Sequence, residues 1–70
     1  MPLITVKAVG EKTVEQKRGL AKDITEAVVK NFKVPPEAVF IDMVEYSGKN
    51  LAKGGKLVLD SPPPGIKQGK

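Results

Sequence analysis

The spacing of apolar residues changes twice along this chain, and this change limits the fold more than any other feature. Apolar and β-branched residues alternate from residue 2 to 9, which is typical of a strand. From residue 14 to about 32 they recur every three or four positions, as on one side of a helix. From residue 38 to 45 the alternation returns. The sequence therefore predicts a strand, a helix and a second strand.

Local signals mark both ends of the predicted helix. Thr13 is an expected N-cap, and Gln16, three residues later, completes a capping box. Pro35 and Pro36 cannot continue a helix, so we expect it to end before them. The apolar stripe expected to face the strands consists of Leu20, Ala21, Ile24, Ala27, Val28 and Phe32.

Each predicted strand has one fully apolar face. We expect the apolar face of the first strand to be buried and that of the second to lie against the helix. These faces carry Ile4, Val6 and Ala8 in the first strand and Val39, Ile41 and Met43 in the second. The opposite face of the second strand places Asp42 between Phe40 and Val44. An acidic residue between apolar neighbours indicates a face that meets a partner subunit or lines a site. An exposed position at a sheet edge is the alternative.

A strand, a helix and a strand with short connections form a β-α-β unit, with parallel strands and a right-handed crossover. Gly54 and Gly55 then predict a hairpin turn, followed by a short strand at 57–59. We therefore predict an α/β (α+β) fold made of a single β-α-β unit and a short C-terminal hairpin. The domain would cover residues 1–60, and a tail rich in Pro, Gly and Lys would follow at 61–70.

A chain of 70 residues with no cysteine and no histidine has few ways to stabilise its fold. Small domains usually add disulfides, metal sites or subunit contacts to a small core. Disulfides are excluded here, and the commonest metal ligands are missing. A two-stranded parallel sheet with one helix also leaves one face and both edges uncovered. We therefore expect a homo-oligomer.

The net charge of +4 comes from scattered lysines and a single arginine. This pattern favours a solvated surface, or a pocket for an anionic small molecule, over a nucleic-acid interface. The sequence has no signal-peptide pattern, and no apolar run approaches the ~20 residues of a membrane span. We therefore expect a cytoplasmic protein with no membrane partner.

The residue types available for catalysis indicate a candidate catalytic group at the amino terminus. Without His or Cys, Ser-His-Asp and Cys-His mechanisms are excluded. If Met1 is removed, the ring nitrogen of Pro2 becomes a secondary amine at the start of a strand. An α-amine normally has a pKa near ~8, and apolar surroundings or a nearby cation such as Lys12 lower that pKa. Such an amine would be a neutral base near pH 7. The simpler interpretation is a proline that suits the first position of a strand.

Several features together resemble the 4-oxalocrotonate tautomerase family. They are the initial Met-Pro, the strand that begins directly after it, Glu15-Gln16-Lys17 at the head of the helix and Gly54-Gly55 before a short strand. The resemblance covers roughly residues 2–59. It implies a tautomerase, an isomerase that moves a proton between carbons of a small enol or dienol acid and its keto isomer. It also implies an amino-terminal proline, here Pro2, as general base, no cofactor or metal, and a homohexamer with sites at subunit boundaries.

Three further positions follow from the resemblance, and each departs from the family. An arginine that binds the substrate carboxylate falls at Lys12, which keeps the charge but loses the bidentate fork. A second arginine, which polarises the substrate carbonyl, falls at Phe40. An aromatic residue of the pocket wall falls at Leu51, which is apolar but not aromatic. Unless a neighbouring lysine replaces the second cation, these departures indicate altered substrate choice, such as a mono-acid or a phenyl-type enol acid.

Two alternatives stay open at this point. In the first, the chain is a non-catalytic oligomeric module that binds anions or nucleic acid through Lys49, Lys53 and Lys56. Binding to DNA or RNA would then depend steeply on salt. In the second, the chain is a catalytically silent member of the same family, kept for assembly. Retention of Met1 favours this second alternative, because the nitrogen of Pro2 is then an amide.

Overall fold

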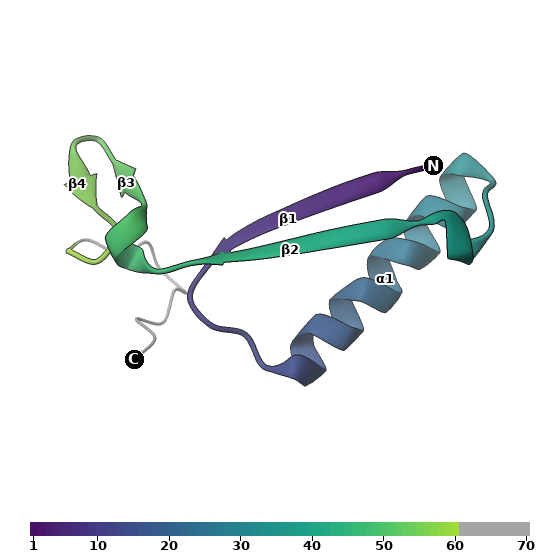
Figure 1. The fold of residues 1–70 in the computed structure, drawn as a ribbon, viewed down its shortest axis with the longest axis horizontal. Helices are drawn as coiled ribbons and strands as arrows, with labels where there is room; N and C mark the ends of the chain where they lie inside the picture. Colours follow the sequence, from purple (N-terminus) through teal and green to yellow (C-terminus); the bar gives the residue numbers. More distant parts are fainter. Residues whose placement is uncertain (61–70) are drawn as a thin grey trace. The chain divides into compact units, whose positions relative to one another are not determined.

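The computed structural model describes residues 1–60, so the tail predicted at 61–70 lies outside the described residues. Figure 1 shows the elements in chain order. They are β1 (Leu3–Val9), α1 (Val14–Phe32), the 3₁₀ turn η1 (Pro36–Ala38), β2 (Phe40–Tyr46), the 3₁₀ turn η2 (Gly48–Asn50), β3 (Ala52–Lys53) and β4 (Lys56–Leu57). No helix in this part of the chain combines the length and the apolar character that crossing a membrane requires.

The strands form two small sheets, β1 with β2 and β3 with β4. The backbone N–H of Phe40 donates to the carbonyl oxygen of Pro2 at 3.0 Å, where β1 and β2 begin. The N–H of Gly10 donates to the carbonyl of Tyr46 at 2.9 Å, where they end. These bonds join start to start and end to end, so β1 and β2 are parallel. The predicted β-α-β unit followed by an antiparallel hairpin is confirmed.

The chain divides into two compact units. The first comprises residues 1–6 and 12–42, which include the start of β1, all of α1 and η1, and the start of β2. Among the described residues, the second comprises 7–11 and 43–60, which include the ends of β1 and β2, η2 and the β3–β4 hairpin.

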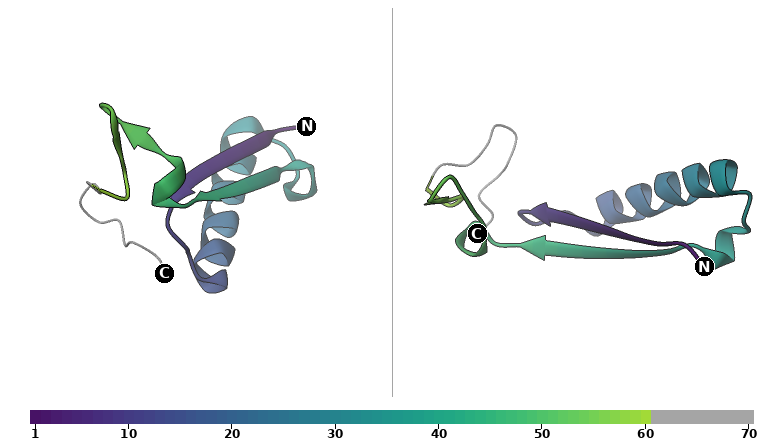
Figure 2. Two further views of the ribbon diagram at one scale, coloured as in Figure 1. Left: turned by 60° about the vertical axis from the view of Figure 1, so that its left-hand side comes forward. Right: turned by 90° about the horizontal axis from the view of Figure 1, so that it is seen from above.

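In the first unit, α1 lies along one side of the starts of β1 and β2 (Figure 2). Within this unit, side-chain burial alternates along the starts of both strands, as the predicted faces require. The partly buried positions are Ile4, Val6, Val39 and Ile41, and the exposed positions between them are Leu3, Thr5, Phe40 and Asp42. The apolar faces predicted in these segments are therefore the sheltered ones.

Both ends of α1 are capped, the first by the signal that the sequence predicted. The Thr13 hydroxyl oxygen accepts a hydrogen bond from the N–H of Gln16 at 3.0 Å, and the Gln16 side chain accepts one from the N–H of Thr13 at 2.9 Å. The predicted capping box is thus present. At the other end, Lys33 adopts a left-handed conformation (φ 60°), and its N–H donates to the carbonyl of Val29 at 3.0 Å.

The buried stripe of α1 differs from the predicted one. Leu20, Ala27 and Phe32 are exposed, although the sequence placed them on the inner face. The partly buried helix positions are Lys17, Ala21, Ile24, Thr25, Val28 and Val29. The helix lies against only two strands, so some of its apolar side chains stay in solvent. The turn η1 also packs against α1 and covers part of another side of the helix.

The bounds of two strands were predicted wrongly. The second strand begins at Phe40 rather than residue 38, because residues 36–38 form η1, in which Val39 N–H donates to the carbonyl of Pro36 at 3.1 Å. The strand expected at 57–59 is shorter and earlier, at residues 56–57. Val58 lies beyond β4, and its N–H donates at 2.8 Å to the carbonyl of Leu51, the residue opposite it in the register of the hairpin.

One chain buries few of its own apolar side chains. Val58, only 5% exposed, is the one buried side chain among residues 1–60. Large apolar side chains in both units remain open to solvent, including Leu3, Phe32, Phe40 and Leu59. An isolated chain therefore lacks the continuous core that stabilises most domains.

Replacing Thr13 by alanine should lower the free energy of unfolding by about 1 kcal/mol, because the N–H of Gln16 loses its acceptor. Urea denaturation at fixed protein concentration measures the change. Thr13→Ser keeps the hydroxyl and should retain most of the stability. Equal losses in the two variants would show that the cap does not contribute.

Replacing Gly55 by alanine should cost about 1–2 kcal/mol, because Gly55 has a φ of 82°, where a Cβ is strained. Gly19 is the matched control, since it lies inside α1 with nothing within 4 Å of a built Cβ. Gly19→Ala should raise stability by about 0.5–1 kcal/mol. Thermal melts of both variants test the opposite signs, and equal shifts would contradict the prediction.

Candidate active site

Pro2 stands directly before β1, at the end of the sheet where β2 also begins. Its carbonyl oxygen accepts the hydrogen bond from Phe40 N–H at 3.0 Å, which ties it to the start of β2. Pro2 itself is partly buried, whereas Met1, bonded to its ring nitrogen, is 90% exposed. The backbone of Pro2 is therefore held by the sheet, while its nitrogen lies on the side of the exposed first residue.

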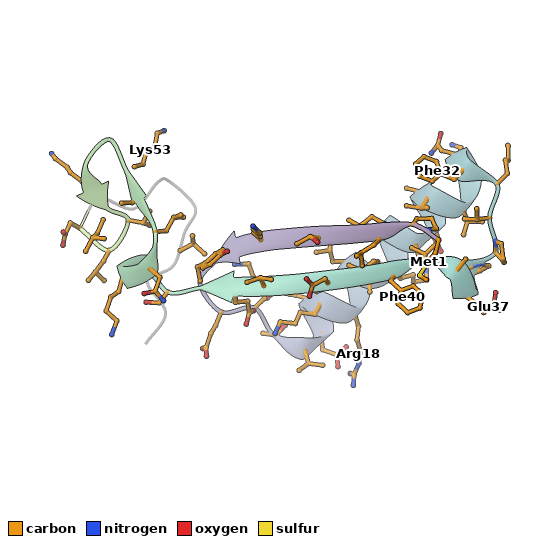
Figure 3. All side chains as sticks on the ribbon, turned by 45° about the horizontal axis from the view of Figure 1, so that its top comes forward. Met1, Arg18, Phe32, Glu37, Phe40 and Lys53 are labelled. Atoms are coloured by element: carbon orange, nitrogen blue, oxygen red, sulfur yellow. The ribbon has the colours of Figure 1, made fainter. Side chains whose placement is uncertain are left out.

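The surface next to Pro2 is apolar. Leu3 follows Pro2 in the chain and is 68% exposed, and Phe40 is 51% exposed. Figure 3 shows Met1 and Phe40 at the same end of the strand pair, with Phe32 from the last turn of α1 and Glu37 from η1 also at that end. We call Pro2, Leu3 and Phe40 the proline end. A ligand bound there would contact hydrocarbon and an aromatic ring.

Lys12 lies at the other end of α1, directly before the cap residue Thr13. The 19 residues of α1 extend over about 28 Å at ~1.5 Å per residue. The starts of β1 and β2 lie near the last turn of α1, not the first (Figure 1). The structure therefore does not bring Lys12 to the Pro2 of its own chain, and any effect of Lys12 on the pKa of a Pro2 amine would need a second copy.

Leu51 belongs to the second unit, where it follows η2 and accepts the hydrogen bond from Val58 N–H. Its side chain is 40% exposed. The lysines of the anion-binding alternative gather in the same unit. Lys53 and Lys56 are directly opposite each other in the β3–β4 hairpin, and the backbone N–H of Lys49 donates to the hydroxyl of Ser47 at 3.1 Å.

The described residues include no group of three or more His, Cys, Asp or Glu side chains that could hold a metal ion. They do include a groove of about 590 Å³ that sequence reasoning missed. It is lined by Ala21, Lys22, Thr25, Glu26, Val29, Lys30 and Pro36. The sequence feature that could have predicted this groove is the four-residue spacing of the small and branched residues at 21, 25 and 29. The groove includes none of Pro2, Lys12 and Leu51.

Comparison with known proteins shows the family to which this chain belongs. A family model described as "Tautomerase enzyme" matches residues 2–60. The chain belongs to the tautomerase family. A protein named as a probable tautomerase in Bradyrhizobium diazoefficiens is 43% identical over 60 residues, which cover 86% of this chain and 90% of that protein. This membership supports an enzyme of the isomerase type.

Solved structures place this tautomerase-family protein with the 4-oxalocrotonate tautomerases, so the resemblance in the sequence is confirmed. A 4-oxalocrotonate tautomerase isozyme from Methylibium petroleiphilum superposes with a TM-score of 0.79 at 34% identity, covering 84% of this chain and 92% of that one. A structure described for trans-3-chloroacrylic acid dehalogenase activity superposes with a TM-score of 0.71 at 28% identity, covering 80% and 97%. Related chains thus carry at least two named activities.

Proposed function

We propose that this protein is a cofactor-independent keto-enol tautomerase with Pro2, freed by removal of Met1, as its general base. The substrate is a small enol or dienol acid or its keto isomer. The observation that carries the proposal is the position of Pro2, held by the hydrogen bond from Phe40 at the start of β1 and flanked by apolar side chains. Membership of the tautomerase family supports the same reaction class.

The chemistry follows from a neutral imino nitrogen at this position. In the keto-to-enol direction, the nitrogen takes a proton from the carbon next to the substrate carbonyl. The electron pair of the broken C–H bond forms a carbon–carbon double bond, and the π pair of the carbonyl moves onto its oxygen. Return of the proton to another carbon of the conjugated system, or to the oxygen, completes the isomerisation. Apolar side chains such as Leu3 and Phe40, once a second copy covers them, would favour the neutral amine, because an apolar environment solvates an ammonium poorly.

A complete pocket requires more than one copy of the chain. Lys12 is the candidate for binding the substrate carboxylate, and it lies at the opposite end of α1 from its own Pro2. A second copy can supply Lys12, and Leu51 is the candidate for an apolar wall of the pocket. The exposed apolar side chains of a single chain support self-association, which we propose to be a homohexamer.

Replacing Pro2 by alanine should lower kcat/KM for an enol acid at least about 100-fold, because a positioned general base contributes that much or more. Insertion of one alanine between Met1 and Pro2 should have a similar effect, since it keeps the ring but turns its nitrogen into an amide. Steady-state assays over a panel of enol acids measure both variants. Unchanged turnover in both would reject Pro2 as the base.

Two controls accompany this comparison. The mass of the intact protein from cells should lack Met1, and a mass that includes Met1 would favour a catalytically silent protein. For the unmodified enzyme, kcat/KM should rise with pH as the imino group loses its proton. The midpoint should lie below the pKa near ~8 of an ordinary α-amine, because the apolar surroundings disfavour the charged form.

Replacing Lys12 by alanine should lower kcat/KM about tenfold, mainly through KM, because the substrate carboxylate loses its cation. Lys12→Arg should retain most of the activity. Lys22 is a matched control, since its ammonium is exposed and pairs with Glu26 at 3.2 Å on α1. Lys22→Ala should leave KM unchanged, and equal effects of the two alanine variants would remove Lys12 from the binding site.

A further inference from the structure

We propose that the groove between α1 and η1 is a further ligand site, which binds a monocarboxylate with an apolar tail. The groove includes none of the residues proposed for the reaction, Pro2, Lys12 and Leu51. All of its lining residues belong to the first unit of the chain. Its volume of about 590 Å³ lies within the range of about 300–1,000 Å³ that is typical of small-molecule sites.

The floor of the groove is mostly apolar. Ala21, Thr25 and Val29 recur four residues apart, so they share one face of α1, and each is partly buried. Pro36 completes the lining from η1, which packs against α1. From Ala21 to Val29 the helix rises about 12 Å, at ~1.5 Å per residue. The alkyl chain of an acid such as octanoate can therefore lie along most of this distance.

The rim of the groove carries one cation that has no acidic partner. Lys22, Glu26 and Lys30 also recur four residues apart, and all three are exposed. The Glu26 carboxylate pairs with the Lys22 ammonium at 3.2 Å, which leaves Lys30 without an ion pair among residues 1–60. A carboxylate bound at Lys30 would supply the missing anion, whereas a cationic ligand would meet a rim of net positive charge.

The floor and the rim together define the class of ligand. A small polar anion such as acetate can pair with Lys30 but leaves the apolar floor in water. A neutral apolar molecule such as 1-octanol covers the floor but leaves the ammonium unpaired. Octanoate makes both contacts, because its tail removes apolar surface from water and its carboxylate pairs with Lys30. Octanoate is therefore the probe, and acetate and 1-octanol represent its two parts.

Amide chemical shifts of the full-length protein, in its assembled state, test the site. Octanoate below its micelle-forming range should saturably shift the amide signals of Ala21, Thr25, Val29 and Lys30. Its affinity should be at least about tenfold above that of acetate, because the tail adds apolar contact, and about fivefold above that of 1-octanol, because the carboxylate adds an ion pair. No shift at these amides, as when a second copy covers the groove, would overturn the proposal. Equal affinities for octanoate and either of its parts would also overturn it.

Three variants then test the charges of the rim. Lys30→Met removes the ammonium and should weaken octanoate about fivefold while leaving 1-octanol unchanged. Glu26→Gln should strengthen octanoate about twofold, because it removes a like charge and frees Lys22. Lys53→Met is the matched control, since it changes the net charge equally at an exposed lysine of the β3–β4 hairpin, outside the groove. It should leave octanoate binding unchanged, with circular dichroism and assembly size checked for each variant.

The outcomes separate a specific site from general attraction to a basic protein. Equal weakening in Lys30→Met and Lys53→Met would indicate a nonspecific charge effect and reject the site. Weaker binding in Glu26→Gln would contradict the arrangement of charges proposed for the rim. The shifts in the groove should persist in Pro2→Ala, so this inference and the function proposed for Pro2 can fail independently. Shifts that disappear in Pro2→Ala would place octanoate at the proline end and overturn the inference.

Discussion

The parallel pairing of β1 and β2 is the constraint on which the rest of this structure depends. Parallel strands begin at the same end of a sheet, so the chain must return over the full length of β1 before β2 can start. The seven residues of β1 span about 23 Å, and α1 covers about 28 Å in the opposite direction. The Thr13–Gln16 box and the left-handed Lys33 set the length of that return. As a result, Phe40 meets Pro2.

The same small unit leaves most of its apolar surface uncovered. Two strands and one helix shelter Ile4, Val6 and Ile41 only partly, and within residues 1–60 Val58 alone is buried. A domain of this size has no disulfide to compensate, because the chain has no cysteine. Assembly and catalysis are therefore linked in the proposed function, since the contacts that would cover these faces would also bring Lys12 of one copy toward Pro2 of another.

Membership of the tautomerase family does not by itself choose a substrate. Related structures carry the names of a tautomerase and of a dehalogenase activity on the same fold. Chemistry on a shared fold is decided by the side chains at the site. In this chain the residues proposed to hold the substrate are Lys12 and Leu51, and the residue proposed as base, Pro2, is present.

The sequence alone determined the features that depend on neighbours a few residues away. Apolar periodicity predicted the strands and helix, Thr13 with Gln16 predicted the helix start, and Gly54 with Gly55 predicted a turn whose φ values are 59° and 82°. Tertiary structure decided what depends on pairing between distant segments. It formed η1 where the second strand was expected to begin, ended β4 at Leu57, joined Phe40 to Pro2 and separated Lys12 from both. Local signals depend on residues within one turn or strand, so the sequence shows them directly. Strand register and packing depend on contacts between segments that are distant in the sequence.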